Sequence, residues 1–136
     1  MFASSGCGVC HRSSLRVELP RAGPSAATRE AAQDAASHAL IHPYTDLLLH
    51  DMGQGLADRN AQETVLAPSV WRTAPLWGMH AAYVSNQPVR LLHDGRARSI
   101  EEAVLWHDGE ARDARNRYSH LTAEQRRTLA DWITGL

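Results

Sequence analysis

Two cysteines and a histidine near the start of the sequence have the spacing of a cofactor attachment site. Cys7 and Cys10 are the only cysteines among the 136 residues, and His11 follows directly after them. C-x-x-C-H is the attachment signature of c-type haem. Its two thiols add across the haem vinyl groups, and the adjacent imidazole lies under the iron as the proximal ligand. The motif therefore predicts one covalent haem c, held by these three residues, and a role in electron transfer.

Two other uses of a C-x-x-C pair fit the rest of the sequence less well. A redox-active dithiol of the thioredoxin type belongs to a βαβ arrangement, and the sequence lacks that pattern. A structural zinc site would need a second cysteine pair or a well-spaced histidine pair, and the sequence has no further cysteine. Haem attachment is therefore the preferred interpretation.

The spacing does not determine the sixth ligand of the iron. His107 closes a predicted helix in which Val104 and Trp106 could shield a haem face. Met52 and Met79 follow apolar segments and have glycines nearby, which would let the backbone approach the ring. The full set of candidates is these residues and His38, His42, His50, His80, His93 and His120. The residue pattern alone leaves the choice open.

Composition limits both the fold and the partners. With 43% hydrophobic and 6% aromatic residues, the chain can form one domain with a modest core. Its 14 basic and 15 acidic residues give a net charge of -1, which argues against nucleic-acid binding. Every basic residue is an arginine. Arg72, Arg96 and Arg98 are candidates to pair with haem propionates, because a guanidinium forms forked bonds to carboxylates.

Helices are predicted mainly in the last third of the sequence. Ser99 and Glu102 form an S-x-x-E capping box that opens a helix ending near His107. Thr122 and Gln125 form a second capping box, which opens a terminal helix. Between these two, a largely solvated helix is predicted from Glu110 to Ser119.

The rest of the sequence gives weaker predictions. A helical turn is expected over residues 7–13, and residues 54–69 are predicted as loop. The Ala-rich run 26–39 has helix propensity but almost no large apolar side chains to bury. The predicted fold class is mainly α: residues 1–136 form a single cytochrome c-like haem domain with short helices and long irregular loops.

The location of the protein is predicted from the haem motif. No stretch has the length of a transmembrane helix, and residues 1–6 lack the basic start and apolar run of a secretory signal. Haem is attached to cysteines of this kind outside the cytoplasm, so a periplasmic location is expected although this chain shows no signal peptide. We therefore expect the chain to be part of a larger protein.

Several short motifs in this order resemble those of a known family. The resemblance covers nearly the whole chain and is weakest over residues 14–41. The sequence is similar to the C-terminal haem domain of the bacterial di-haem oxidoreductases, described as peroxidase-like or thiol oxidoreductase-like and related to the di-haem cytochrome c peroxidases. The motifs that carry it are Cys7-Gly8-Val9-Cys10-His11, Leu48-Leu49-His50-Asp51-Met52-Gly53, Ala74-Pro75-Leu76-Trp77-Gly78, Leu92-His93-Asp94-Gly95-Arg96 and Leu105-Trp106-His107-Asp108-Gly109-Glu110-Ala111.

The resemblance implies roles for individual residues. In the related peroxidases, the helix after the His-x-Gly turn carries a methionine that binds the electron-transferring haem, and that position falls on His107 here. His107 is therefore the expected distal ligand, with Met52 as the alternative, and the iron would be low-spin with two histidines. His93 is expected in a tight turn that positions the helix. His50 and Asp51 are expected to form a polar link at the haem edge or to a second domain.

The resemblance also sets the expected activity. Family members with peroxidase activity have two haems, whereas this sequence has one C-x-x-C-H motif. The expected function is that of the electron-accepting C-terminal domain, working with a redox partner protein or a second haem domain. The alternative is a haem enzyme that acts directly as a peroxidase or thiol oxidoreductase, so the sequence leaves open whether this chain is itself an enzyme.

Overall fold

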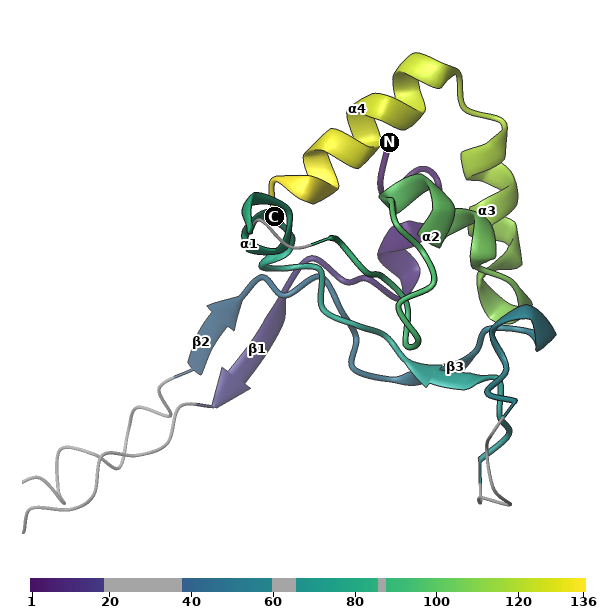
Figure 1. Ribbon diagram of the computed structural model, residues 1–136. Coiled ribbons are helices and arrows are strands. Elements are labelled where there is room, and N and C mark those ends of the chain that lie inside the picture. Colours follow the sequence, from purple (N-terminus) through teal and green to yellow (C-terminus); the bar gives the residue numbers. More distant parts are fainter. Residues whose placement is uncertain (19–37, 60–65, 86–87) are drawn as a thin grey trace, which may run out of the picture.

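The computed structural model describes residues 1–18, 38–59, 66–85 and 88–136 (Figure 1). Within these ranges, the four short strands come first and the four α-helices follow. In chain order the elements are the 3₁₀ turn η1 (Cys7–Val9), β1 (Leu15–Glu18), β2 (His38–Ile41), β3 (Leu49–Asp51), η2 (Gln54–Leu56), β4 (Val70–Arg72), α1 (Met79–Val84), α2 (Ile100–Trp106), η3 (Gly109–Ala111), α3 (Arg112–Ser119) and α4 (Ala123–Thr134).

The core lies where α2, α3 and α4 meet. Ile100, Tyr118, Leu129 and Ile133 form its buried cluster, and Phe2 packs against it from the start of the chain. Phe2 therefore brings the N-terminal segment, with the cysteine motif, against the helices. Figure 1 shows the same arrangement, with the N-terminus and η1 beside α2 and beneath α4.

Side-chain caps begin the two helices that the sequence predicted most clearly. The Ser99 hydroxyl accepts the Glu102 backbone N–H at 3.1 Å and opens α2. Thr122 and Gln125 form a complete capping box that opens α4. The predicted capping box at Thr122 is confirmed, whereas at Ser99 only the N-cap bond forms, because the Glu102 carboxylate accepts the Arg98 backbone N–H at 2.8 Å and not that of Ser99.

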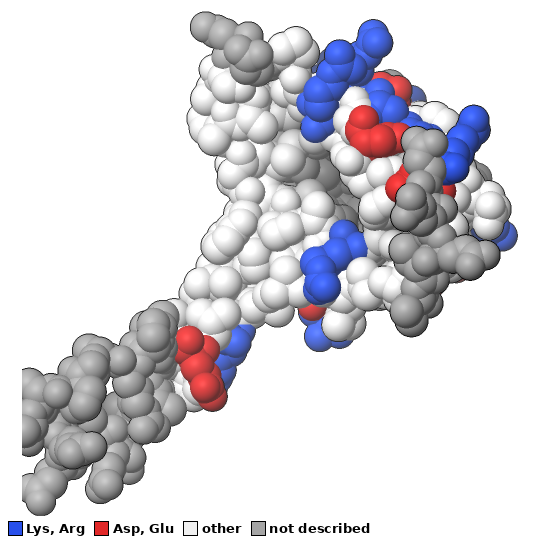
Figure 2. Space-filling view, turned by 60° about the horizontal axis from the view of Figure 1, so that its bottom comes forward, with Lys and Arg blue, Asp and Glu red and all other residues white. Residues whose placement is uncertain are grey.

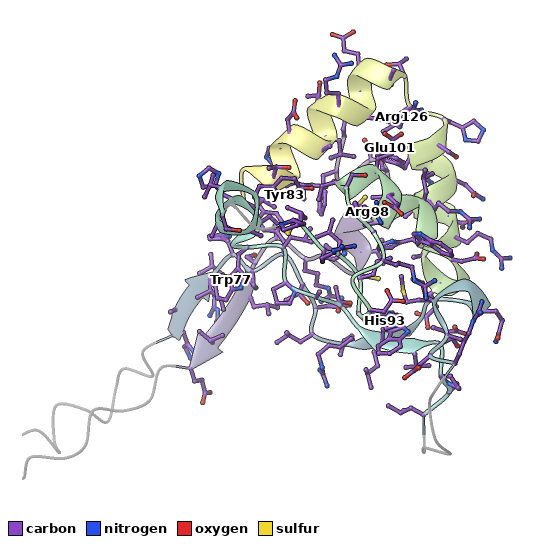
Figure 3. The ribbon with its side chains drawn as sticks, in the orientation of Figure 1. Trp77, Tyr83, His93, Arg98, Glu101 and Arg126 are labelled. Carbon is purple, nitrogen blue, oxygen red and sulfur yellow. The ribbon has the colours of Figure 1, made fainter. Side chains whose placement is uncertain are left out.

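An ion pair also joins the first of these helices to the last. Figure 3 shows Glu101 and Arg126 facing each other between α2 and α4, and their closest atoms, Oε1 and Nε, are 3.1 Å apart. This contact ties the N-terminal end of α2 to α4.

Two small antiparallel sheets complete the described structure. In one, β1 pairs with β2, with Leu15 opposite Ile41, and this pair leads away from the helices in Figure 1. In the other, β3 pairs with β4, with His50 opposite Trp71. The second sheet lies next to η3, so it can place side chains beside the segment that follows α2.

The prediction of a mainly α, cytochrome c-like fold was wrong. In the described part of the chain, helix accounts for 39% of residues and strand for 15%, in four short α-helices and two small sheets. The strands escaped prediction because each has only three or four residues and pairs with residues 19 or more positions away in sequence. The loop predicted over residues 54–69 contains η2. Of the Ala-rich run, residues 26–37 lie outside the described residues, and Ala39 belongs to β2.

The face of the described residues shown in Figure 2 carries both signs of charge. On the face shown in Figure 2, basic and acidic side chains lie next to each other on the same parts of the surface. Among the described residues, no helix is both long and apolar enough to span a bilayer.

Candidate functional site

The cysteine motif forms a single tight turn. Gly6 enters it with φ 85°, a left-handed conformation that glycine adopts readily. The turn η1 follows, and the His11 backbone N–H donates to the Cys7 carbonyl at 2.9 Å. Both cysteines are free thiols and half-buried. The turn therefore presents two thiols and an imidazole from five consecutive residues.

The His11 ring is oriented by the backbone of a distant residue. Its Nδ1 lies 3.0 Å from the carbonyl oxygen of Tyr44. Because a carbonyl can only accept, Nδ1 carries the proton and the Nε2 lone pair is left for another partner. Tyr44 and Phe2 pack edge-on, with ring centroids 6.0 Å apart, so aromatic side chains also cover this part of the motif.

His107 is held in the same way from the opposite end of the sequence. It follows α2 as the C-cap residue, and its Nδ1 lies 2.7 Å from the Ala103 carbonyl. Its Nε2 lone pair is therefore also left for another partner. A histidine that binds a metal commonly donates its other ring N–H to a backbone carbonyl or carboxylate, which fixes the tautomer. Both imidazoles meet this requirement.

Burial keeps both imidazoles uncharged. Desolvation is the main cause that lowers the pKa of His11 and of His107, and the proximity of His107 lowers the pKa of His11 further. A neutral imidazole is the form that binds a metal. Two thiols and two neutral imidazoles that each leave Nε2 unoccupied by a backbone carbonyl are donor types that a covalently attached haem would use.

The two thiols are poorly suited to dithiol redox chemistry. Burial raises the pKa of Cys7. Burial and the carboxylates of Asp46 and Glu110 raise the pKa of Cys10. A reactive dithiol needs a thiolate with a lowered pKa, so these environments favour a structural or attachment role for the pair.

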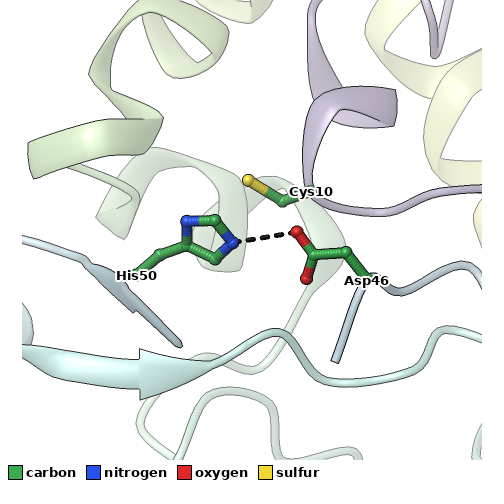
Figure 4. Close-up of side chains that lie close together, drawn as sticks. All are labelled: Cys10, Asp46 and His50. Atoms are coloured by element: carbon green, nitrogen blue, oxygen red, sulfur yellow. Dashed lines mark hydrogen bonds and ion pairs between the residues drawn. The ribbon is translucent and has the colours of Figure 1, made fainter. Parts of the chain in front are cut away.

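A charged cluster lies beside Cys10. His50 on β3 has its Nε2 2.9 Å from Asp46 Oδ2 and its Nδ1 2.7 Å from Glu110 Oε2. Figure 4 shows Asp46 and His50 facing each other, with the Cys10 sulfur next to both. The side chain of Asp46 is 4% exposed, whereas that of Glu110 is 55% exposed. The hydrogen bonds to Glu110 and Asp46 raise the pKa of His50.

Comparison with known proteins identifies the family of this chain. The family model described as "Di-haem oxidoreductase, putative peroxidase" matches residues 1–136, the whole chain. The chain belongs to the di-haem oxidoreductase family. No curated protein and no solved structure matched the chain. The membership indicates haem as the cofactor and oxidoreduction as the chemistry, in agreement with the residues gathered around η1.

The partners of His50 in this di-haem oxidoreductase chain are two carboxylates. His50 was expected to contribute, with Asp51, a polar link at the haem edge or to a second domain; within the chain its side-chain partners are Asp46 and Glu110. The Asp51 carboxylate instead accepts the Gly53 N–H at 2.8 Å. Asp46 and Glu110 were missed because no helix places Asp46 next to His50, and Glu110 is 60 residues away.

The predicted arginines have protein partners of their own. Arg72 donates to the Leu47 carbonyl. Arg96 pairs with Asp94 at 2.6 Å, donates to the Gly55 carbonyl at 2.7 Å and lies over the Trp106 ring. These bonds occupy Nε, NH1 and NH2 of Arg96, so a propionate would have to share them.

Met52, Met79 and His93 make contacts other than with the cysteine motif. The Met52 backbone N–H donates to the Ser69 carbonyl just after β3, and Met79 packs against the helical core. His93 lies in the turn before α2 and stacks on Trp71, with centroids 3.7 Å apart and planes 9° from parallel. A cavity of about 730 Å³ is bordered by this stack and by Arg96 and Trp106.

The pKa values of three histidines, two lowered and one raised, predict how the stability of the haem-free chain depends on pH. His11 and His107 have a pKa below the ordinary 6.5. The unfolded chain therefore binds their protons more readily, and stability falls as pH drops below 6.5. His50 has a pKa above 6.5, so its contribution is complete below 6.5 and is lost as pH rises through its folded value. Stability should thus be greatest near pH 6.5.

Urea unfolding at about pH 5, 6.5 and 8 measures this dependence. A His50→Gln variant should lose the decline above pH 6.5, and a His107→Gln variant should lose part of the decline below it. A midpoint that rises steadily across this whole range in the unsubstituted chain would contradict the assignment of these shifts.

Proposed function

We propose that the chain carries one covalent haem c on Cys7 and Cys10, with His11 and His107 as axial ligands, and that it transfers electrons. The observation that carries the proposal is the matched geometry of the two imidazoles. Each has Nδ1 bound to a backbone carbonyl, is half-buried, and is kept neutral by burial. The family membership supports haem and oxidoreductase chemistry.

In this proposal the two cysteines and the two histidines each have a defined role. Cys7 and Cys10, both free and half-buried, would anchor the cofactor through thioether bonds. His11 and His107 would supply the protein ligands of the haem iron, and their backbone carbonyl partners keep the rings from rotating. The haem supplies a one-electron redox centre. Rigid ligands favour electron transfer because little has to rearrange when the charge changes.

A second candidate function is direct haem catalysis, as a peroxidase or thiol oxidoreductase. The family description favours it. It requires an open coordination position on the iron, whereas two histidine ligands would leave none. The coordination state therefore separates the candidates: a six-coordinate iron with two nitrogen ligands supports the carrier, and a five-coordinate or labile iron supports the enzyme.

The family also bears on the partners. Its description names two haems, and this sequence has one C-x-x-C-H motif. We infer that the chain is the C-terminal, electron-accepting haem-bearing part of a two-haem system, and that a second haem domain or a redox partner protein exchanges electrons with it. A periplasmic location belongs to the same proposal, since c-type haem is attached outside the cytoplasm.

The proposal is tested by exporting the chain in cells that express the haem-attachment machinery. We expect a low-spin c-type absorption spectrum without a sulfur–iron band, and a pyridine haemochrome of one haem per chain. A variant with Cys7→Ala and Cys10→Ala is the control and should carry no covalent haem. A chain recovered with both thiols free and no haem would overturn the proposal.

A further inference from the structure

Cys10, Asp46 and His50 bring three kinds of metal-binding atom together. One ligand atom from each lies within 4.8 Å of the other two, and all three residues are half-buried (Figure 4). Zn²⁺ takes thiolate, carboxylate and imidazole ligands at about 2.0–2.3 Å in tetrahedral geometry. Two ligands of one such ion lie roughly 3.3–3.8 Å apart. The cluster is therefore close to the size that an ion requires.

The orientation of the donors points to the same use. Glu110 holds the Nδ1 side of His50 at 2.7 Å, which leaves Nε2 facing Asp46 and Cys10. Asp46 Oδ1 accepts the Leu48 N–H at 2.9 Å, which leaves Oδ2 facing His50. A carboxylate behind a histidine is the usual outer support of a zinc ligand. The cluster thus has both ligands and the group that orients one of them.

We propose that, before haem attachment, this chain binds one zinc-class divalent ion through Cys10 Sγ, Asp46 Oδ2 and His50 Nε2, with a fourth position open to water. The ion takes the place of the proton between His50 Nε2 and Asp46 Oδ2. Binding releases that proton and the thiol proton of Cys10, so affinity rises with pH. This site uses only one of the two cysteines, which distinguishes it from a zinc site on the C-x-x-C pair.

Haem attachment should displace the ion. The Cys10 S–H adds across a vinyl C=C bond: sulfur bonds to one carbon, hydrogen goes to the other, and no oxidant or reductant is consumed. The product is a neutral thioether, which is a far weaker zinc ligand than a thiolate. This part of the inference rests on the proposed haem function, whereas ion binding to the haem-free chain does not.

The first experiment uses the full haem-free chain with reduced thiols, titrated with Zn²⁺ by calorimetry and with Co²⁺ by absorption. We expect one equivalent and a thiolate–cobalt charge-transfer band. His50→Ala and Cys10→Ser should remove binding, and Glu110→Gln should weaken it roughly 10- to 100-fold. Cys7→Ser and His120→Ala are matched controls that should bind as the unsubstituted chain does.

The controls make the inference falsifiable. If Cys7→Ser removes binding as fully as Cys10→Ser, the ion is held by the cysteine pair and the proposed site is wrong. If His50→Ala and Glu110→Gln bind with unchanged affinity, the site is also wrong. Far-ultraviolet circular dichroism of each variant shows whether it is folded. Glu110→Gln changes a side chain that is 55% exposed, so it is the substitution least expected to disturb the fold.

The second experiment measures the metal content of the haem-attached protein, which should hold no zinc. Zinc retained at full occupancy beside an attached haem would overturn the displacement. The two proposals fail in different ways. A chain that binds zinc at Cys10 but never takes haem contradicts only the haem function, and a chain that takes haem but binds no zinc when haem-free contradicts only this site.

Discussion

Replacing His107 with methionine is expected to raise the reduction potential of the attached haem by about 0.1–0.2 V, a fraction of the roughly 0.8 V that axial ligation spans. A histidine–methionine pair stabilises the reduced iron more than two histidines do. His107 occupies the C-cap of α2, where its Nδ1 is fixed by Ala103. A spectroelectrochemical titration measures the shift, and a sulfur–iron absorption band should appear with it.

His107→Ala should have a different effect at the same position. It removes the imidazole without supplying another ligand, so the spectrum should change from low-spin to high-spin. An open iron should also bind added imidazole, which would restore the low-spin spectrum. This rescue would separate the loss of a ligand from a general loss of structure.

Two further variants decide between the candidate ligands. His120→Met changes an exposed histidine at the end of α3 and should leave the potential unchanged. Met52→Ala should also leave it unchanged. If Met52→Ala gives a high-spin haem and His107→Met does not shift the potential, Met52 is the sixth ligand and the axial assignment proposed above is wrong.

Gly109→Ala is expected to lower the free energy of unfolding by about 3–5 kcal/mol, which places it among the most damaging single substitutions. Gly109 has φ +56°, and a Cβ there would overlap the Asp51 carbonyl oxygen and lie 2.8 Å from the Gly53 nitrogen. Both obstacles are backbone atoms, so no side chain can move aside. Urea unfolding of the haem-free chain measures the loss.

Gly78→Ala is the matched control, because it isolates the cost of the backbone conformation. Gly78 also has a left-handed φ of +82°, but a Cβ there would meet nothing within 4 Å. Its substitution should cost only about 1 kcal/mol. If both variants lose the same free energy of unfolding, the overlap of a Cβ at position 109 with the backbone of residues 51 and 53 adds nothing to the cost of the substitution.

The same close approach has a consequence for the charged cluster. Gly109 packs on Asp51 and Gly53, and the next residue, Glu110, reaches His50. A side chain at position 109 would therefore push Glu110 away from His50. We expect Gly109→Ala to reduce the ordering of His50 as well as the stability of the chain.

Local sequence was enough to predict some elements. The caps at Ser99 and Thr122 act within one helical turn, so α2 and α4 were predicted with nearly correct limits. The strands were not predictable in this way. The pairing of His50 with Trp71 across β3 and β4 depends on which distant segments meet, and a three-residue strand has too few residues to show a period of two.

The sequence by itself determined the spacing of the two thiols and the adjacent imidazole. Cys7, Cys10 and His11 lie within five residues, so their spacing is set by covalent geometry and one tight turn, and the di-haem oxidoreductase family was recognised from short motifs in order. The tertiary structure decided what surrounds the motif. The Tyr44 carbonyl behind His11 and the Glu110 carboxylate beside His50 come from segments 30 or more residues away in sequence. Their meeting depends on burial and packing of the whole chain, which local propensity does not encode.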